Sequence, residues 1–295
     1  MNNLTIQPAS RLEALKPDVV VLATLKARRR MTQRLQNLGF TGQIVTLPGD
    51  DSDPYFNKNL PDREDLRRFQ NLHAKQPAVI IGNGPSLLKT DPRRLKEKIT
   101  FACNSIFLLE NFTPNYYCVE DLLVAEDRAS VINNLPWIKF FPQDCKQWLS
   151  SGHFFNGHRV PEITKFSTDF AEGIQINATV TYTMLQLAFH MGCDPVYLIG
   201  VDHSYTVSKA QSDRDRNILT SKTDDPNHFH PDYFGRGLRW HDPRVDRMEI
   251  AYRLAKAAFT RHDRKIFNAT GGGKLEIFDR IDFEKIRVTS SRFTN

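Results

Sequence analysis

The sequence is poor in cysteine and contains no long apolar run. Only 4 of its 295 residues are cysteine, and they form no CxxC pair and no zinc-type spacing with histidine. This excludes a disulfide-stapled protein, and we expect buried free thiols in a reducing compartment. No apolar run approaches the roughly 18 residues that cross a bilayer, and the polar start MNNLTIQPAS lacks the features of a secretion signal. These observations predict a cytoplasmic protein.

The charge balance is mildly basic, with 40 Lys+Arg against 34 Asp+Glu and a formal net charge of +6. Basic and acidic residues are interspersed except at residues 28–30, which are all arginine. We therefore expect no nucleic-acid partner, whereas phosphorylated small molecules suit this bias. Peripheral contact with a negatively charged membrane surface stays open, as does assembly into a homo-oligomer.

Short β-rich runs alternate with longer segments of helical period, which is typical of a parallel sheet covered by helices. We expect an α/β protein with a Rossmann-like, mostly parallel sheet and helices on both of its faces. A charged helix is predicted after the GNGPS loop, ending near Lys98. Two further helices are predicted, one over 179–191 capped by Asn177 or Thr179, and one over 244–262. The expected strands are residues 19–23, 44–47, 78–81, 99–103, 116–119, 196–199 and 265–267.

The chain is predicted to have two parts. Residues 1–60 form a β-α-β extension and a linker, because 48–61 is rich in Pro, Gly, Asp and Asn. Residues 61–295 form the nucleotide-binding catalytic domain. Its long polar segment 203–243 lacks clear periodicity but is rich in aromatic residues and histidine, which favours a lid over a disordered insertion.

Polar residues follow four of the expected strands, at the edge where an open α/β sheet binds its ligands. In the loop GNGPS, Gly82 and Gly84 let the backbone turn and approach a ligand, and Ser86 can bond an amide or a phosphate oxygen. The loop is neither a Walker sequence nor GxGxxG. A turn that only reverses the chain is the alternative. Asn104 has the same two interpretations.

Acidic residues also stand at the strand ends. Glu120, Asp121 and Asp202 could hold a hydrated Mg²⁺, since hard cations take carboxylate oxygens, or they could simply cap helices. No cofactor is certain from the sequence, and Mg²⁺ is the one left open. The histidines of segment 203–243 are the plausible acid–base groups, because imidazole titrates near neutral pH.

Four motifs in order, IIGNGPSL at 80–87, FACN at 101–104, PNYYCVED at 114–121 and VYLIGVDHSY at 196–205, resemble the MptE-like domain family. That family includes archaeal 6-hydroxymethylpterin diphosphokinases and bacterial flagellin-glycosylation accessory proteins. The same order is similar to bacterial sialyltransferases of the Campylobacter type. The resemblance covers about residues 78–270.

The sialyltransferase resemblance implies a CMP-activated nonulosonic acid as donor and a glycan as acceptor. Tyr205 would steady the donor phosphate, and Asp121 stands where those enzymes have a second Asn. The catalytic base would be His230, with His228 and His241 as alternatives; Tyr233 would donate to the leaving phosphate and Arg236 would offset its charge. The nucleotide-binding set would be Gly82, Asn83, Gly84, Ser86, Asn104, Asp121, Thr179, Gly200, Asp202 and Tyr205.

The diphosphokinase resemblance uses the same loop for Mg-ATP, with a pterin as acceptor and Glu120, Asp121 and Asp202 organising the metal. It accounts better for the acidic residues and less well for segment 203–243. The leading hypothesis is a glycosyltransferase of surface polysaccharide or glycoprotein assembly. The alternatives are the pyrophosphokinase and a non-catalytic nucleotide-binding accessory protein.

Overall fold

The chain divides into two compact units, Met1–Asn57 and Lys58–Asn295. In the first, strands β1 (Val19–Leu22) and β2 (Gln43–Thr46) pair in parallel. The predicted linker 48–61 lies outside the described residues, as does most of the predicted helix between β1 and β2. The computed structural model describes residues 19–22, 35, 43–46, 62–95, 97–206, 211–213 and 218–288.

The second unit is built on an eight-stranded parallel sheet, with strand order β15-β14-β10-β3-β4-β5-β6-β7. This confirms the predicted α/β fold. A separate pair, β8 (Gly157–Arg159) and β9 (Ile174–Ile176), is also parallel. The sheet strands are β3 (Ala78–Ile81), β4 (Ile99–Cys103), β5 (Tyr116–Cys118), β6 (Ile138–Pro142), β7 (His153–Phe155), β10 (Val196–Ile199), β14 (Ile266–Asn268) and β15 (Asp279–Arg280).

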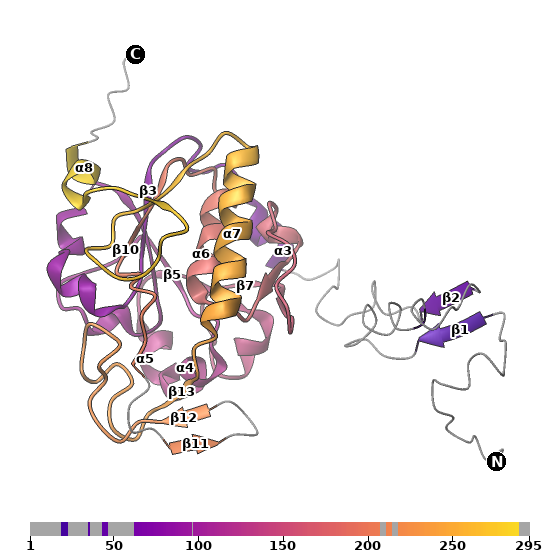
Figure 1. The fold of residues 1–295 in the computed structure, drawn as a ribbon, viewed down its shortest axis with the longest axis horizontal. Coiled ribbons are helices and arrows are strands. Elements are labelled where there is room, and N and C mark those ends of the chain that lie inside the picture. Colours follow the sequence, from indigo (N-terminus) through magenta and orange to yellow (C-terminus); the bar gives the residue numbers. More distant parts are fainter. Residues whose placement is uncertain are drawn as a thin grey trace. The chain divides into compact units, whose positions relative to one another are not determined.

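Helices cover both faces of the sheet (Figure 1). Because side chains alternate along a strand, Ala78 and Ile80 join one apolar cluster and Val79 and Ile81 the other. The first cluster is closed by α3 (Asp62–Arg67), α6 (Val180–His190) and α7 (Val245–Arg261); the second by α4 (Leu122–Asp127), α5 (Ala129–Asn134) and α8 (Phe283–Val288).

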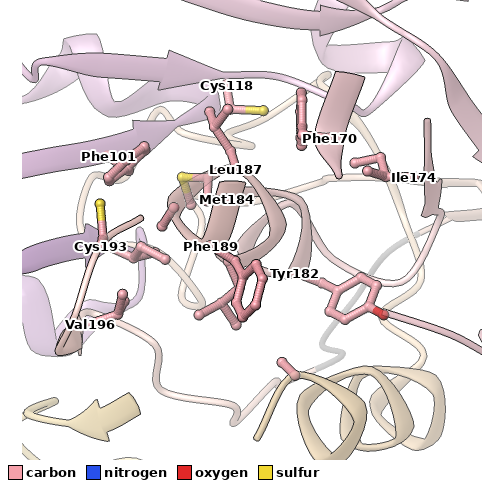
Figure 2. Packing of buried hydrophobic residues seen from close by; sticks show 14 of the residues in the cluster. Phe101, Cys118, Phe170, Ile174, Tyr182, Met184, Leu187, Phe189, Cys193 and Val196 are labelled. Carbon is pink, nitrogen blue, oxygen red and sulfur yellow. The ribbon is translucent and has the colours of Figure 1, made fainter. Parts of the chain in front are cut away.

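Helix α6 is the centre of the first cluster, where its apolar side chains pack on those of the strands (Figure 2). The hydroxyl of Thr179 accepts a bond from the Thr181 amide and caps the helix, as predicted. Gly192 follows the helix with a φ of 84°, a conformation that glycine adopts without strain. The predicted helices 179–191 and 244–262 are thus confirmed to within a residue or two at each end.

The segment after β3 differs from its predicted helix. Two short 3₁₀ helices stand there instead, η2 (Pro85–Lys89) and η3 (Pro92–Leu95). Pro92 has no amide to donate, and its ring would clash with the carbonyl of residue 88 in a continuous α-helix. The remaining 3₁₀ helices are η4 (Asn104–Leu108), η5 (Gln143–Gln147) and η6 (Phe170–Glu172).

Segment 203–243 contains a small antiparallel sheet, β11 (Gln211–Asp213), β12 (Ile218–Thr220) and β13 (Arg239–His241). Strand β13 is fastened to α4, because Arg239 forms ion pairs with Asp127 and with Glu126, the latter at 3.0 Å. No helix among the described residues is long and apolar enough to cross a membrane.

The order of the sheet reverses between β3 and β10, and there two backbone loops are in direct contact. The Gly82 amide donates to the Ile199 carbonyl at 2.8 Å, and the Gly84 amide donates to the Gly200 carbonyl at 2.8 Å. A Cβ at Gly82 would collide with the Gly200 carbonyl oxygen. These glycines therefore allow one loop to approach the other. The sequence predicted instead that they let the backbone approach a ligand.

We expect Gly82→Ala to lower the free energy of unfolding by about 3 kcal/mol, because the obstructing atom is backbone and cannot move aside. Gly271→Ala is the matched control, since its Cβ would meet only the Thr90 hydroxyl at 3.5 Å. It should change stability by less than about 1 kcal/mol. Urea unfolding measures both, and equal losses would contradict the assignment.

Candidate functional site

A cavity of about 350 Å³ opens at the carboxyl ends of β3, β4, β5 and β10, beside the point where the strand order reverses. Open α/β sheets bind ligands at this place, and the volume is within the range of small-molecule sites. Its wall is made by the strand ends, the first turn of α6, segment 203–243 and the first turn of α7.

The structure brings most of the predicted site residues to this cavity and leaves three outside its lining. Ser86 is buried and bonded to Asp202, the His230 side chain is 34% exposed near Asp232, and Arg236 is exposed. The predicted residues that line the cavity are Gly82, Asn83, Gly84, Asn104, Glu120, Asp121, Thr179, Gly200, Asp202, Tyr205, His228, Tyr233 and His241.

Asp202 holds three strand-end loops together. Its carboxylate accepts from the Ser86 hydroxyl at 2.6 Å and from the Ser86 amide at 3.3 Å, which ties the β10 loop to the β3 loop. Its carbonyl accepts from the Lys274 amide of the β14 loop at 2.7 Å. The Asp202 carboxylate thus has protein donors on both of its oxygens.

Glu120 is a buried carboxylate with protein donors on both oxygens. It accepts from the Thr183 hydroxyl and, at 3.4 Å, from the Asn177 amide. Burial raises the pKa of Glu120, and the Thr183 hydrogen bond and the Arg159 charge oppose this only in part.

Asp121 caps α4 and pairs with a histidine. It accepts from the Leu123 amide at 2.8 Å, while its second oxygen lies 2.8 Å from Nδ1 of His241. Burial raises its pKa, but the bond to His241 and the helix amides outweigh burial, so the pKa lies below its ordinary value.

The three acids do not fit a protein-held Mg²⁺. Protein donors are hydrogen-bonded to the carboxylate oxygens of all three, Glu120, Asp121 and Asp202. Within the described ranges, no three His, Cys, Asp or Glu residues are grouped to hold a metal ion. Of the two predicted roles for these acids, helix capping is the one that Asp121 has, at the start of α4.

One part of the cavity wall favours negative charge. The first turn of α6, with Thr179 and Val180, lines the cavity and carries no acidic residue of its own, so the positive end of the helix dipole faces the cavity beside the buried Glu120 carboxylate. Arg247 also lines the cavity and, in the described part of the chain, forms no ion pair; its Nη2 donates to the Val160 carbonyl at 2.6 Å and its buried Nε has no partner. Burial and the nearby Arg244 charge lower the pKa of Arg247.

The sequence did not predict the two arginines of the cavity wall. Arg247 lies in the first turn of a helix that carries no motif, and Arg159 is the last residue of β8, a short strand that was not predicted. Arg159 is held by Asp144 at 2.6 Å and donates to the Glu120 carbonyl at 2.6 Å. The helical period of 244–262 indicated a helix, but nothing in it indicated that its first turn faces a cavity.

The cavity wall also carries amides and aromatic rings. The Asn83 amide nitrogen donates to the Cys103 carbonyl at 3.1 Å, while its Oδ1 is buried without a partner. The Nε1 of Trp240, 8% exposed, is also buried without a partner. Burial raises the pKa of Tyr205 to about 12, and its hydroxyl contacts the Met248 sulfur at 3.7 Å. Unpaired polar atoms at a cavity wall suit a polar ligand.

Three histidines line the cavity, and two of them have a carboxylate on Nδ1; the third, His203, has no hydrogen-bond partner on either ring nitrogen. His228 lies 2.7 Å from Asp225, and His241 lies 2.8 Å from Asp121. The ring of Tyr233 is 1% exposed, and its hydroxyl bonds to the Asn104 side chain and the Ser105 backbone, which partly offsets the raising of its pKa by burial. Tyr233 thus fastens segment 203–243 to the end of β4.

The parallel sheet with helices on both faces defines a Rossmann-like α/β protein. Its candidate ligand site is the cavity at the carboxyl ends of the strands, where the strand order reverses. A family model, 6-hydroxymethylpterin diphosphokinase MptE-like, matches residues 55–208, just over half of the chain. The chain belongs to this MptE-like family. Comparison with curated proteins and with solved structures found no match. The resemblance to sialyltransferases stays a prediction.

Because burial raises the pKa of Glu120 above the ordinary 4.5, the folded state holds its proton more tightly than the unfolded state. Stability is therefore lost as pH rises from the unfolded pKa through the folded one. Glu120→Gln cannot ionise, so its advantage over the natural protein should grow from near zero at about pH 4 to about 1 kcal/mol at neutral pH.

Urea unfolding at several pH values measures this difference. The exposed Glu64, 82% accessible, provides the control Glu64→Gln, which should follow the natural protein. A difference between Glu120→Gln and the natural protein that does not change with pH would contradict the argument.

Proposed function

We propose that the protein is a nucleotide-dependent transferase, and that it transfers the diphosphoryl group of ATP to the hydroxyl of a 6-hydroxymethylpterin-like acceptor. The observation that carries the proposal is the cavity where the strand order reverses, whose wall holds a helix N-terminus, Arg247 and unpaired amide and indole atoms. Membership of the MptE-like family supports diphosphoryl transfer over the other candidate reactions.

The two kinds of polar group in the cavity wall suit the phosphates and the nucleoside of a nucleotide. Phosphates would lie at the first turn of α6 near Arg247, where helix dipole and guanidinium both favour negative charge. The base and ribose would lie toward Asn83 and Trp240, whose unpaired atoms need hydrogen-bond partners. This division gives Arg247, Asn83 and Trp240, three of the wall residues with an unpaired polar atom, a ligand group to contact.

The reaction itself needs positioning, charge neutralisation and one proton acceptor. The acceptor hydroxyl oxygen forms a bond to the β-phosphorus of ATP, and the bond from that phosphorus to the α,β-bridging oxygen breaks. AMP leaves with the electron pair, and the hydroxyl proton passes to an imidazole of the cavity. Arg247 would offset the charge that develops on the phosphoryl oxygens. No step is assigned to a protein-held metal, because the carboxylates do not fit one.

Glycosyl transfer from a CMP-activated nonulosonic acid is the second candidate. It is favoured by one observation, that Glu120, Asp121 and Asp202 are already hydrogen-bonded to protein groups. Such a transfer would use the same cavity for the nucleotide and the same imidazoles to accept the proton of a sugar hydroxyl.

Titration calorimetry with ATP and with CMP, each with Mg²⁺ and with EDTA, tests the proposal. We expect ATP to bind, and AMP to form when a 6-hydroxymethylpterin is added. Selective CMP binding that survives EDTA, without ATP binding, would replace the proposal by the second candidate. Nucleotide binding without turnover of either donor would indicate the non-catalytic accessory protein.

Arg247→Gln should weaken ATP binding at least about 10-fold, or about 1.4 kcal/mol, because the cation at the phosphate end is lost. Arg253→Gln is the matched control on the same helix, since Arg253 is 69% exposed and pairs only loosely with Glu249 at 3.8 Å. It should leave the affinity within about twofold. Equal effects of the two changes would place the phosphates elsewhere.

A further inference from the structure

A buried carboxylate fixes the ring of one cavity histidine. The Asp225 side chain is 3% exposed, and its Oδ2 lies 2.7 Å from Nδ1 of His228. The same oxygen accepts from the Phe234 amide at 2.9 Å, and Oδ1 accepts from the Asn227 amide at 2.8 Å. An ionised carboxylate can only accept, so Nδ1 of His228 carries the proton and Nε2 of the neutral ring keeps its lone pair.

Burial raises the pKa of Asp225, but the hydrogen bonds from His228 and from the Asn227 and Phe234 amides outweigh burial, so the pKa lies below its ordinary value. Asp225 is therefore ionised at neutral pH. A buried anion of this kind is tolerated only because each of its oxygens is hydrogen-bonded.

Stacking holds the His228 ring in place on its other side. The ring lies face to face with Tyr233, with centroids 3.8 Å apart and an interplanar angle of 5°. The next residue, Phe229, donates its amide to the Asn83 carbonyl at 2.9 Å, which ties this segment to the loop after β3. The ring is thus fixed against rotation at the wall of the cavity.

The other histidines are held less firmly or lie elsewhere. His241 is 43% exposed, and its partner Asp121 is shared with the first amides of α4. His203 also lines the cavity, but neither of its ring nitrogens has a hydrogen-bond partner, and its Nε2 lies 3.7 Å from Glu249. His230, the base that the sequence favoured, is not among the residues that line the cavity. His228, with its side chain 16% exposed, is the cavity imidazole whose orientation and tautomer are both determined by buried partners.

We propose that Nε2 of His228 is the proton acceptor of the transfer reaction and that Asp225 is the residue that positions it. The inference rests on the proposed function. As the acceptor oxygen bonds to the donor phosphorus and the nucleotide leaves with the electron pair of the broken bond, the hydroxyl proton moves to Nε2. The imidazolium that forms is stabilised by the Asp225 carboxylate and then releases its proton to water.

Asp225→Asn and His228→Gln test the two roles. Asparagine can turn its NH₂ group toward Nδ1, which would move the ring proton to Nε2 and remove the acceptor lone pair. We expect each change to lower the kcat of AMP formation from ATP and a 6-hydroxymethylpterin at least about 100-fold, with KM for ATP within about threefold. The double variant should be no slower than His228→Gln alone, because the residues act as a unit.

Nitrogen NMR of the histidine side chains adds a readout that needs no turnover. The natural protein should show His228 protonated at Nδ1, and Asp225→Asn should move that proton to Nε2. Asp232→Asn is the control, since Asp232 is 80% exposed and lies 3.9 Å from His230, outside the cavity lining. It should change neither the tautomer nor the rate.

The outcomes separate the inference from the function on which it rests. Turnover of Asp225→Asn within about threefold of the natural protein, or loss confined to His241→Gln or His230→Gln, would overturn the role of His228 alone. A natural protein that binds ATP but forms no AMP would remove the proposed function and, with it, the role of His228.

Discussion

The contact between two backbone loops, where the strand order reverses, is the constraint on which the site depends. Gly82 and Gly200 approach so closely that neither position has room for a side chain. That approach brings the loop after β3 and the loop after β10 into one wall, which Asp202 then closes through Ser86. The two loops lie against each other, and the cavity opens beside them at the strand ends of β4 and β5.

Charge is distributed around the cavity in pairs, with one exception. Glu120, Asp121 and Asp225 all have donors, and Arg159 is matched by Asp144. Arg247 is a cavity cation that, in the described ranges, forms no ion pair, and the first turn of α6 lines the same cavity. An anionic ligand would complete this arrangement, which is the electrostatic reason for placing phosphates there.

Local sequence was sufficient for the sheet strands with strong apolar runs and for α6 and α7, whose period and caps are read from neighbouring residues. It was insufficient for β6 and β7 and for the helix predicted before Lys98, which Pro92 breaks. The sequence was also sufficient to predict that the polar residues after the strands lie together in the site, because parallel strands have their carboxyl ends at the same edge of the sheet. Gly82 contacts Gly200, which is more than a hundred residues away in the chain, so no local pattern predicted that contact. Tertiary packing decides where the side chains of Arg247 and Asp225 lie, and no local pattern predicted their positions either.

The central claim is that a nucleotide lies in the cavity between the β3 and β10 loops. Hydrogen–deuterium exchange with and without ATP tests it most directly, because it reports which backbone amides the ligand protects. We expect protection of residues 82–84, 179–181 and 227–241, with little change in the amides of α8. Protection confined to other parts of the chain, or none at ATP concentrations that saturate binding, would contradict it.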